Sequence, residues 1–239
     1  MSPIRTLICT ILLGILPVLA VGDETAAKPV SHTERVIEGW AVHIDDRLLN
    51  GDQRAFGEKC LGVLTNRLID IKAVLPADKV KRLQRVPIWL DQTHGQLKSA
   101  QYHPSAGWLK EHGYSEQLAG CVHIPDAGYF FASVHQFEQP WAVMHELAHA
   151  YHDQVMSFEN PQVKDAWRAF KETGRFKSVR HANGKMREHY ALTNQMEFFA
   201  EMTESYLGRN DFFPFDRTEL EKELPEVYQL LRDTWNSPE

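Results

Sequence analysis

The sequence predicts an α+β fold, in which a small mixed sheet packs on a helix and a mainly helical C-terminal half follows. Three observations support this class. Short segments rich in β-branched and aromatic residues occur before residue 132. Segments with apolar residues at helical spacing dominate from residue 140 onward. No linker rich in Gly, Pro or Ser divides the chain, so residues 32–239 are expected to form one domain.

Periodicity and turn signals place the individual elements. Strands are expected at residues 39–44, 86–90 and 121–124, the last of which could extend to residue 131. Helices are expected at residues 55–74, 140 to about 156, 161 to about 174, 194–207 and 218–235. The long connection 91–119 could contain a short helix near Trp108. The pair Asn183-Gly184 predicts a hairpin or an irregular excursion over residues 175–193.

The first twenty residues are typical of a secretory signal peptide. One positive charge, Arg5, precedes an uninterrupted apolar run that ends at Ala20. The run has about 15 residues and a bilayer span needs about 20, which favours cleavage near Ala20 over a membrane anchor. No later segment is apolar enough to span a membrane. We therefore expect a secreted or periplasmic protein, with residues 21–31 as a flexible lead-in.

Charge and cysteine content limit the classes of partner. Without Arg5 the chain has 25 basic residues against 32 acidic ones, and no basic stripe, so nucleic acid is not an expected partner. Cys60 and Cys121 could form a disulfide in an oxidising compartment, or could be two buried thiols. Neither is expected to bind zinc, because no C-x-x-C spacing occurs.

Residues 145–149 read H-E-L-A-H and predict a metal site. On a helix His145 and His149 share one face and can meet at a single ion, and neutral imidazole is a good zinc ligand. Glu146 lies about 100° around the helix from His145, where it could reach a water and act as general base without being a ligand. The alternative is an ordinary helix with incidental histidines. Apolar flanking residues favour the metal, because buried polar groups need partners.

A catalytic zinc takes three protein ligands and keeps one position for water. The metzincin pattern would place a third histidine where this chain has Val155, and His152 is too close along the helix, so we interpret it as a second-shell or surface residue. Glu197, on the helix expected at 194–207, is the preferred third ligand. Glu201, one turn later, is expected to accept a hydrogen bond from a ligand histidine and to orient it.

Two ordinary interpretations compete for the same glutamates. Glu197, Glu201 and Glu204 could form a solvated acidic stripe on the surface of the helix. Alternatively, Asn194 and Glu197 could form a capping box, in which the glutamate folds back on its own helix. The H-E-x-x-H motif elsewhere in the chain favours ligation over both.

The two segments together resemble the gluzincin metallopeptidases, which carry H-E-x-x-H on one helix and a glutamate ligand on a later one. More narrowly, YALTNQMEFFAE, residues 190–201, resembles the corresponding stretch in the catalytic domain of anthrax lethal factor and its relatives. The resemblance is confined to roughly residues 140–207. It implies a zincin-like fold with one Zn²⁺ per chain, and these roles: ligands His145, His149 and Glu197; general base Glu146; catalytic tyrosine Tyr190; following carboxylate Glu201.

These observations predict an exported zinc-dependent metallopeptidase that acts on a peptide or protein substrate. Metal-activated water would attack the peptide bond, and the Tyr190 phenol would support the oxyanion. An extended peptide could dock on an edge strand formed by residues 121–124. The alternative function is a zinc-stabilised, non-catalytic binding domain of the cell envelope.

Overall fold

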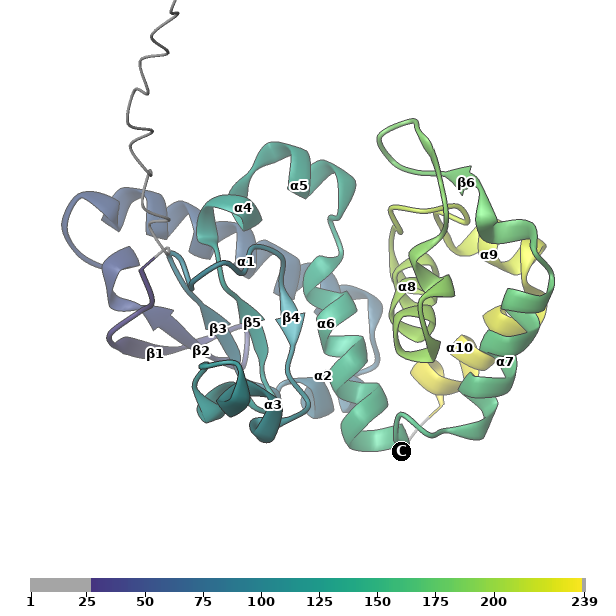
Figure 1. Cartoon of the computed structure of the whole chain (residues 1–239), viewed down its shortest axis with the longest axis horizontal. Coiled ribbons are helices and arrows are strands. Elements are labelled where there is room, and N and C mark those ends of the chain that lie inside the picture. The colour runs from purple at the N-terminus through teal and green to yellow at the C-terminus, as the bar shows by residue number, and fades with distance from the viewer. Residues whose placement is uncertain (1–26, 238–239) are drawn as a thin grey trace, which may run out of the picture.

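The computed structural model describes residues 27–237, so the expected signal peptide lies outside the described residues. The described chain has the predicted α+β class. A five-stranded mixed sheet and its helices occupy the N-terminal half, and the C-terminal half is mainly helical (Figure 1). No helix in this described part is long and apolar enough to cross a membrane.

The sheet has the order β1-β2-β3-β5-β4. Its strands are β1 (His32–Ile37), β2 (Trp40–Asp45), β3 (Ile88–Leu90), β4 (Gln101–Tyr102) and β5 (Val122–Ile124). The central strands β2, β3 and β5 are parallel, and β1 and β4 pair antiparallel at the two edges. The expectation that residues 121–124 form an edge is therefore wrong, because β4 pairs with β5 and covers it. The short β4 and the first strand β1 were not predicted.

Helices cover the sheet in the N-terminal half. The long α1 (Arg54–Val74) is confirmed, and a short helix, α2 (Ala77–Leu83), follows it. The helix near Trp108 is α3 (Ala106–Glu111). The strand at 121–124 does not extend to residue 131, because the Asp126 side chain accepts a hydrogen bond from the Tyr129 amide and so caps α4 (Ala127–Phe131). Another unpredicted helix, α5 (Ser133–Glu138), comes next.

The helix with the H-E-x-x-H motif, α6 (Ala142–Tyr151), lies between the sheet and α8 (Gln195–Leu207) (Figure 1). A π-helical turn, His152–Met156, continues α6 to the predicted end. Trp141 directly precedes α6, and its ring lies against Gly208, at the end of α8. A Cβ at Gly208 would come within 1.8 Å of the Trp141 ring, so this close approach requires glycine.

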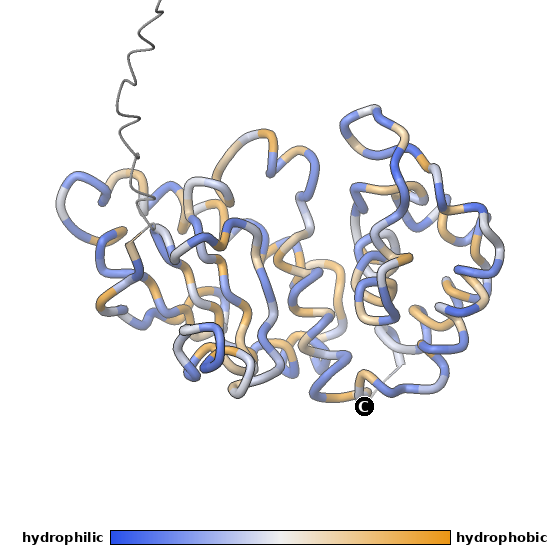
Figure 2. Tube along the Cα trace, in the orientation of Figure 1, coloured by the Kyte–Doolittle hydropathy of each residue, from blue (hydrophilic) through white to orange (hydrophobic). Residues whose placement is uncertain are grey.

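The remaining helices pack around α8. They are α7 (Pro161–Glu172), α9 (Arg217–Glu223) and α10 (Pro225–Asn236), and the predicted hairpin is β6 (Val179–Arg180) with β7 (Met186–Arg187). Hydrophobic and hydrophilic residues alternate along α7 and α10, as expected of amphipathic helices (Figure 2). The single helix expected at 218–235 is divided at Leu224, because Pro225 lacks an amide hydrogen and its ring disfavours a helical conformation at Leu224, which has φ −142° and ψ 62°.

The two cysteines of the described chain, Cys60 and Cys121, are both buried and free. Of the two possibilities that the sequence leaves open, the structure therefore shows the pair of buried thiols. Burial raises the pKa of Cys60 to about 12, so this thiol stays protonated at neutral pH.

Candidate metal centre

Three side chains from two helices converge at the interface between α6 and α8. His145 Nε2 lies 3.1 Å from His149 Nε2, and Glu197 Oε2 lies 3.2 Å from each of these nitrogens. Zinc bonds of about 2.0–2.1 Å in a tetrahedron give ligand-to-ligand distances of about 3.3–3.4 Å. The three atoms therefore already have nearly the spacing that one zinc-sized ion would impose, and they form a group that could hold a metal.

Hydrogen bonding directs the free nitrogen of His145 toward this group. Its Nδ1 lies 2.7 Å from Glu204 Oε1, and a proton on Nδ1 donates to that carboxylate. In a neutral His145 ring, Nε2 then carries no proton, and its lone pair faces the Glu197 carboxylate. Two electron-rich atoms at 3.2 Å repel each other unless a cation lies between them or His145 takes a second proton.

The pKa shifts of Glu197 and His145 also favour positive charge at this group. Burial raises the pKa of Glu197, but the hydrogen bonds from His145 and His149 outweigh burial and hold that pKa well below its ordinary value. Burial lowers the pKa of His145, but its hydrogen bonds to Glu197 and Glu204 outweigh burial and raise that pKa well above its ordinary value. The site thus stabilises positive charge beside an ionised glutamate.

Local structure at the start of α8 orients Glu197. The Asn194 side chain accepts hydrogen bonds from the amides of Met196 and Glu197 at 2.9 Å each, so Asn194 caps the helix as the capping-box alternative expected. The Glu197 side chain does not fold back on its helix, however, and points to His145 and His149 instead. The cap satisfies the amide of Glu197 and leaves its carboxylate available.

The glutamates that follow Glu197 are not a solvated stripe. Glu201 and Glu204 are only 2% and 3% exposed. His145 Nδ1 is hydrogen-bonded to Glu204, whereas Glu201 Oε1 lies 3.8 Å from it, beyond hydrogen-bond distance. The prediction that Glu201 accepts this hydrogen bond is therefore wrong, and the acceptor lies about one helical turn later. Burial raises the pKa of both carboxyls, that of Glu204 to about 7. Positions 197, 201 and 204 share one helix face, so their spacing could not distinguish them.

Glu146 lies beside the group but not in it. Its Oε2 accepts a hydrogen bond of 2.7 Å from the backbone amide of Tyr102, on the edge strand β4. The Tyr102 hydroxyl in turn donates to Asp153 at 2.6 Å. Burial raises the pKa of Glu146. Tyr102 was not predicted as a site residue, because a two-residue strand is too short to give an alternating pattern.

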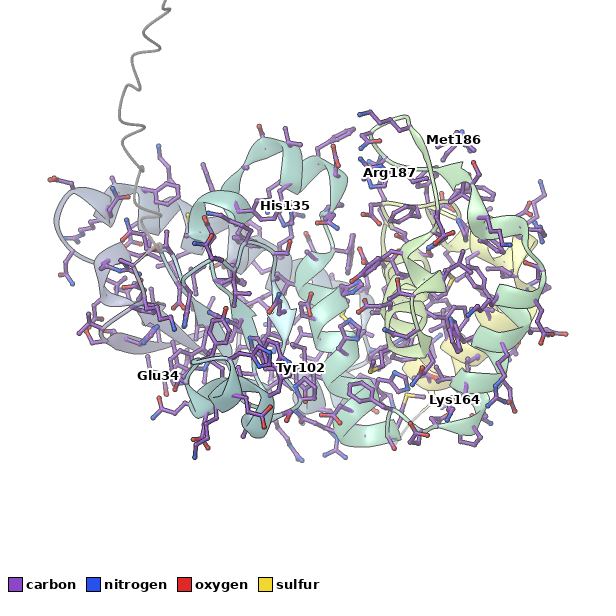
Figure 3. All side chains as sticks on the ribbon, viewed as in Figure 1. Glu34, Tyr102, His135, Lys164, Met186 and Arg187 are labelled. Carbon is purple, nitrogen blue, oxygen red and sulfur yellow. The ribbon has the colours of Figure 1, made fainter. Side chains whose placement is uncertain are left out.

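A cavity of about 1030 Å³ connects these residues. Its lining includes His145, Glu146, His149, Glu197 and Tyr190. Tyr102 and Arg187, which also line it, come from opposite halves of the chain (Figure 3). The cavity therefore lies where the sheet and the helical half meet.

Tyr190 lies in a short 3₁₀ turn, Tyr190–Leu192, at the wall of this cavity. Its side chain is about half exposed. Burial raises the pKa of the phenol, and the negative charge of Glu197 raises it further, so the hydroxyl keeps its proton and can donate a hydrogen bond into the cavity.

His152 is neither a ligand nor a surface residue. It is fully buried in the π-helical turn after α6, with its ring against Phe158 and Phe199. Burial lowers the pKa of His152 to about 4, so its ring is neutral at neutral pH. The expectation of a surface position is wrong, because the ring packs among apolar side chains in the core.

Comparisons with protein-family models, with curated proteins and with solved structures found no match for this chain. The similarity to gluzincins therefore depends on the two motifs quoted above.

Proposed function

We propose that this chain is an exported zinc-dependent metallopeptidase of the gluzincin type, with a peptide or protein as substrate. The observation that supports the proposal is the triangle of His145, His149 and Glu197, with edges of 3.1–3.2 Å, in the wall of a cavity that also exposes a glutamate and a tyrosine. A donor set of two imidazoles and one carboxylate suits zinc and leaves a position for water.

Each residue around the triangle then has a chemical role. When bound, a zinc ion supplies a Lewis acid that lowers the pKa of water toward about 7 and polarises a substrate carbonyl. The Glu146 carboxylate, held by the Tyr102 amide, takes a proton from the attacking water and returns it to the leaving nitrogen. The Tyr190 hydroxyl donates a hydrogen bond to the oxyanion. Glu204 fixes the orientation of the His145 ring.

The edge strand β4 offers a place for the substrate. Residues 99–105 line the cavity and include this strand, so an extended peptide that adds to the sheet edge would pass the metal group. This position replaces the strand at 121–124, which lies inside the sheet.

A single substitution separates catalysis from metal binding. Glu146→Gln should keep the zinc content of the wild type, measured by elemental analysis, and should reduce cleavage of a proteome-derived peptide library by about 10²–10⁴-fold. Glu188→Gln changes an exposed glutamate and serves as the matched control, with activity expected to be unchanged.

The outcomes distinguish the two candidate functions. A wild-type protein that binds zinc at the triangle but cleaves nothing over a broad range of conditions would support the zinc-stabilised binding domain instead. A structural role is the alternative, because an ion would join α6, which contacts the sheet strands β4 and β5, to α8, which packs with the other C-terminal helices. Protein purified without chelators that contains no zinc would refute both functions.

A further inference from the structure

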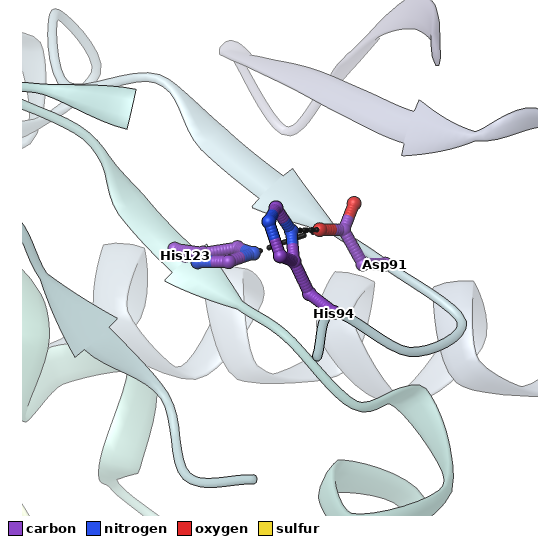
Figure 4. Close-up of side chains that lie close together, drawn as sticks. All are labelled: Asp91, His94 and His123. Carbon is purple, nitrogen blue, oxygen red and sulfur yellow. Dashed lines mark hydrogen bonds and ion pairs between the residues drawn. The ribbon is translucent and has the colours of Figure 1, made fainter. Parts of the chain in front are cut away.

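A second group of metal-binding side chains lies within the sheet half of the molecule (Figure 4). Asp91 directly follows β3, His94 lies in the loop after it, and His123 lies in β5. Asp91 Oδ2 is 2.6 Å from His94 Nδ1 and 2.8 Å from His123 Nε2. The three residues are buried, and Asp91 and His123 are inaccessible to solvent.

Two more histidines form hydrogen bonds to residues of this group. His32 Nε2 lies 2.7 Å from the other oxygen of Asp91, Oδ1. His103 Nε2 lies 3.2 Å from His123 Nδ1. Ligands of metal ions in proteins are commonly oriented by such outer hydrogen bonds, and here the outer partners reach two of the three inner residues.

Among the described residues, Asp91 is paired with histidines. Its ion pairs among the described residues are with imidazoles, from His32, His94 and His123, and none is with a lysine or arginine. A fully buried carboxylate normally needs a cation, from a basic side chain or from a metal. Hydrogen bonds from imidazoles satisfy its oxygens, and a metal ion held by the same groups would compensate its charge.

We propose that Asp91, His94 and His123 form a second binding site for a divalent transition metal, with zinc favoured by the donor set. The residues come from β3, from β5 and from the loop after β3, so the ion would cross-link these segments. Such a buried position suits a structural ion. The proposal is independent of peptidase activity.

Metal binding changes the positions of protons in the group. In the hydrogen-bonded form, His94 Nδ1 and His123 Nε2 both donate to Asp91 Oδ2. To present lone pairs, His94 must carry its proton on Nε2 and His123 on Nδ1. His103, which donates from Nε2 to His123 Nδ1 in the hydrogen-bonded form, then carries its own proton on Nδ1 and accepts from His123. No net proton is lost. The ligand atoms must also separate from 2.6–2.8 Å toward about 3.3 Å, and the loop position of His94 makes this possible.

Metal stoichiometry tests the proposal on the full chain, saturated with zinc and then dialysed. We expect about two equivalents in the wild type and about one in His94→Ala, because two separate sites each require their ligands. His149→Ala, which affects only the centre between α6 and α8, should also retain about one. His112→Ala removes an exposed histidine of the same region and should retain about two.

The stoichiometries distinguish a second metal site from a hydrogen-bond network at Asp91. A wild type with one equivalent that His149→Ala removes and His94→Ala leaves would show that the Asp91 group is a hydrogen-bond network only. One equivalent that His94→Ala removes and His149→Ala leaves would support the second site and refute the centre between α6 and α8.

If His94→Ala does not fold, ¹⁵N NMR of the wild type decides. The His123 proton should move from Nε2 in chelator-treated protein to Nδ1 in zinc-loaded protein, and an unchanged tautomer would overturn the proposal.

Discussion

Replacing Glu204 isolates the contribution of one buried hydrogen bond to metal binding. The bond joins Glu204 Oε1 to His145 Nδ1 at 2.7 Å and orients the ring whose Nε2 faces the metal group. Above its pKa of about 7 the Glu204 carboxylate is charged, whereas glutamine keeps an acceptor oxygen but has no charge. Hydrogen bonds to charged groups exceed neutral ones by about 1–1.5 kcal/mol, so the comparison is made at pH 8. Glu204→Gln should therefore weaken zinc binding about tenfold. Methionine removes the acceptor altogether, so Glu204→Met should weaken it by up to about 100-fold.

Competition with a chromophoric zinc chelator measures these affinities, and Tm at saturating zinc verifies that each variant is folded. Glu201→Gln is the matched control. Glu201 lies on the same face of α8 and is equally buried, but its carboxylate is 3.8 Å from His145 Nδ1 and makes no hydrogen bond to it. We expect no tenfold loss for this variant. The reasoning is refuted if Glu201→Gln weakens binding and Glu204→Gln does not.

Three further predictions concern the ligand, the tyrosine and a buried histidine. Glu197→Ala removes one donor of the triangle, and the same chelator competition should show a loss of zinc affinity above the roughly 100-fold reached by outer partners. Tyr190→Phe should lower kcat on a cleaved peptide about 100-fold at unchanged zinc content, and an unchanged kcat would remove the oxyanion role. His152 takes a proton below pH 6.5 when unfolded but only below about pH 4 when folded, so lowering the pH through this window reduces the free energy of unfolding by up to about 3 kcal/mol. His152→Leu should remove this contribution to the pH dependence. Urea unfolding of both chelator-treated proteins at pH 7 and pH 4.5 measures it, and an equal drop in the free energy of unfolding in wild type and variant would contradict the prediction.

Long periodic segments could be predicted from the sequence because many residues contribute to each pattern. The helix expected at 55–74 is α1, which spans Arg54–Val74, and the helix expected at 194–207 begins after Asn194, whose side chain caps it. Short elements could not be predicted in this way. The strand β4 has two residues, and only its pairing with β5, a tertiary contact, makes it a strand.

The same distinction applies to the sites. The H-E-x-x-H spacing places two imidazoles on one helix face by local geometry, and the structure brings Glu197 to them. The choice between Glu201 and Glu204 depends on how α6 and α8 pack, which no spacing encodes. The Asp91 group depends on sheet register, in which His123 pairs with Trp89, two residues before Asp91. Side chains that meet only through such pairing leave no motif in the sequence.

Several acidic side chains are buried near the interface between α6 and α8. Glu201, Glu204 and Asp211 are buried close to His145, and burial raises the pKa of each of these carboxyls. Ionising these buried carboxyls costs free energy unless positive charge is present nearby. A divalent ion at His145, His149 and Glu197 would supply that charge, and it would do so at the boundary where the sheet half and the helical half form the cavity. An ion at these residues would therefore cross-link α6 and α8 beside the cavity.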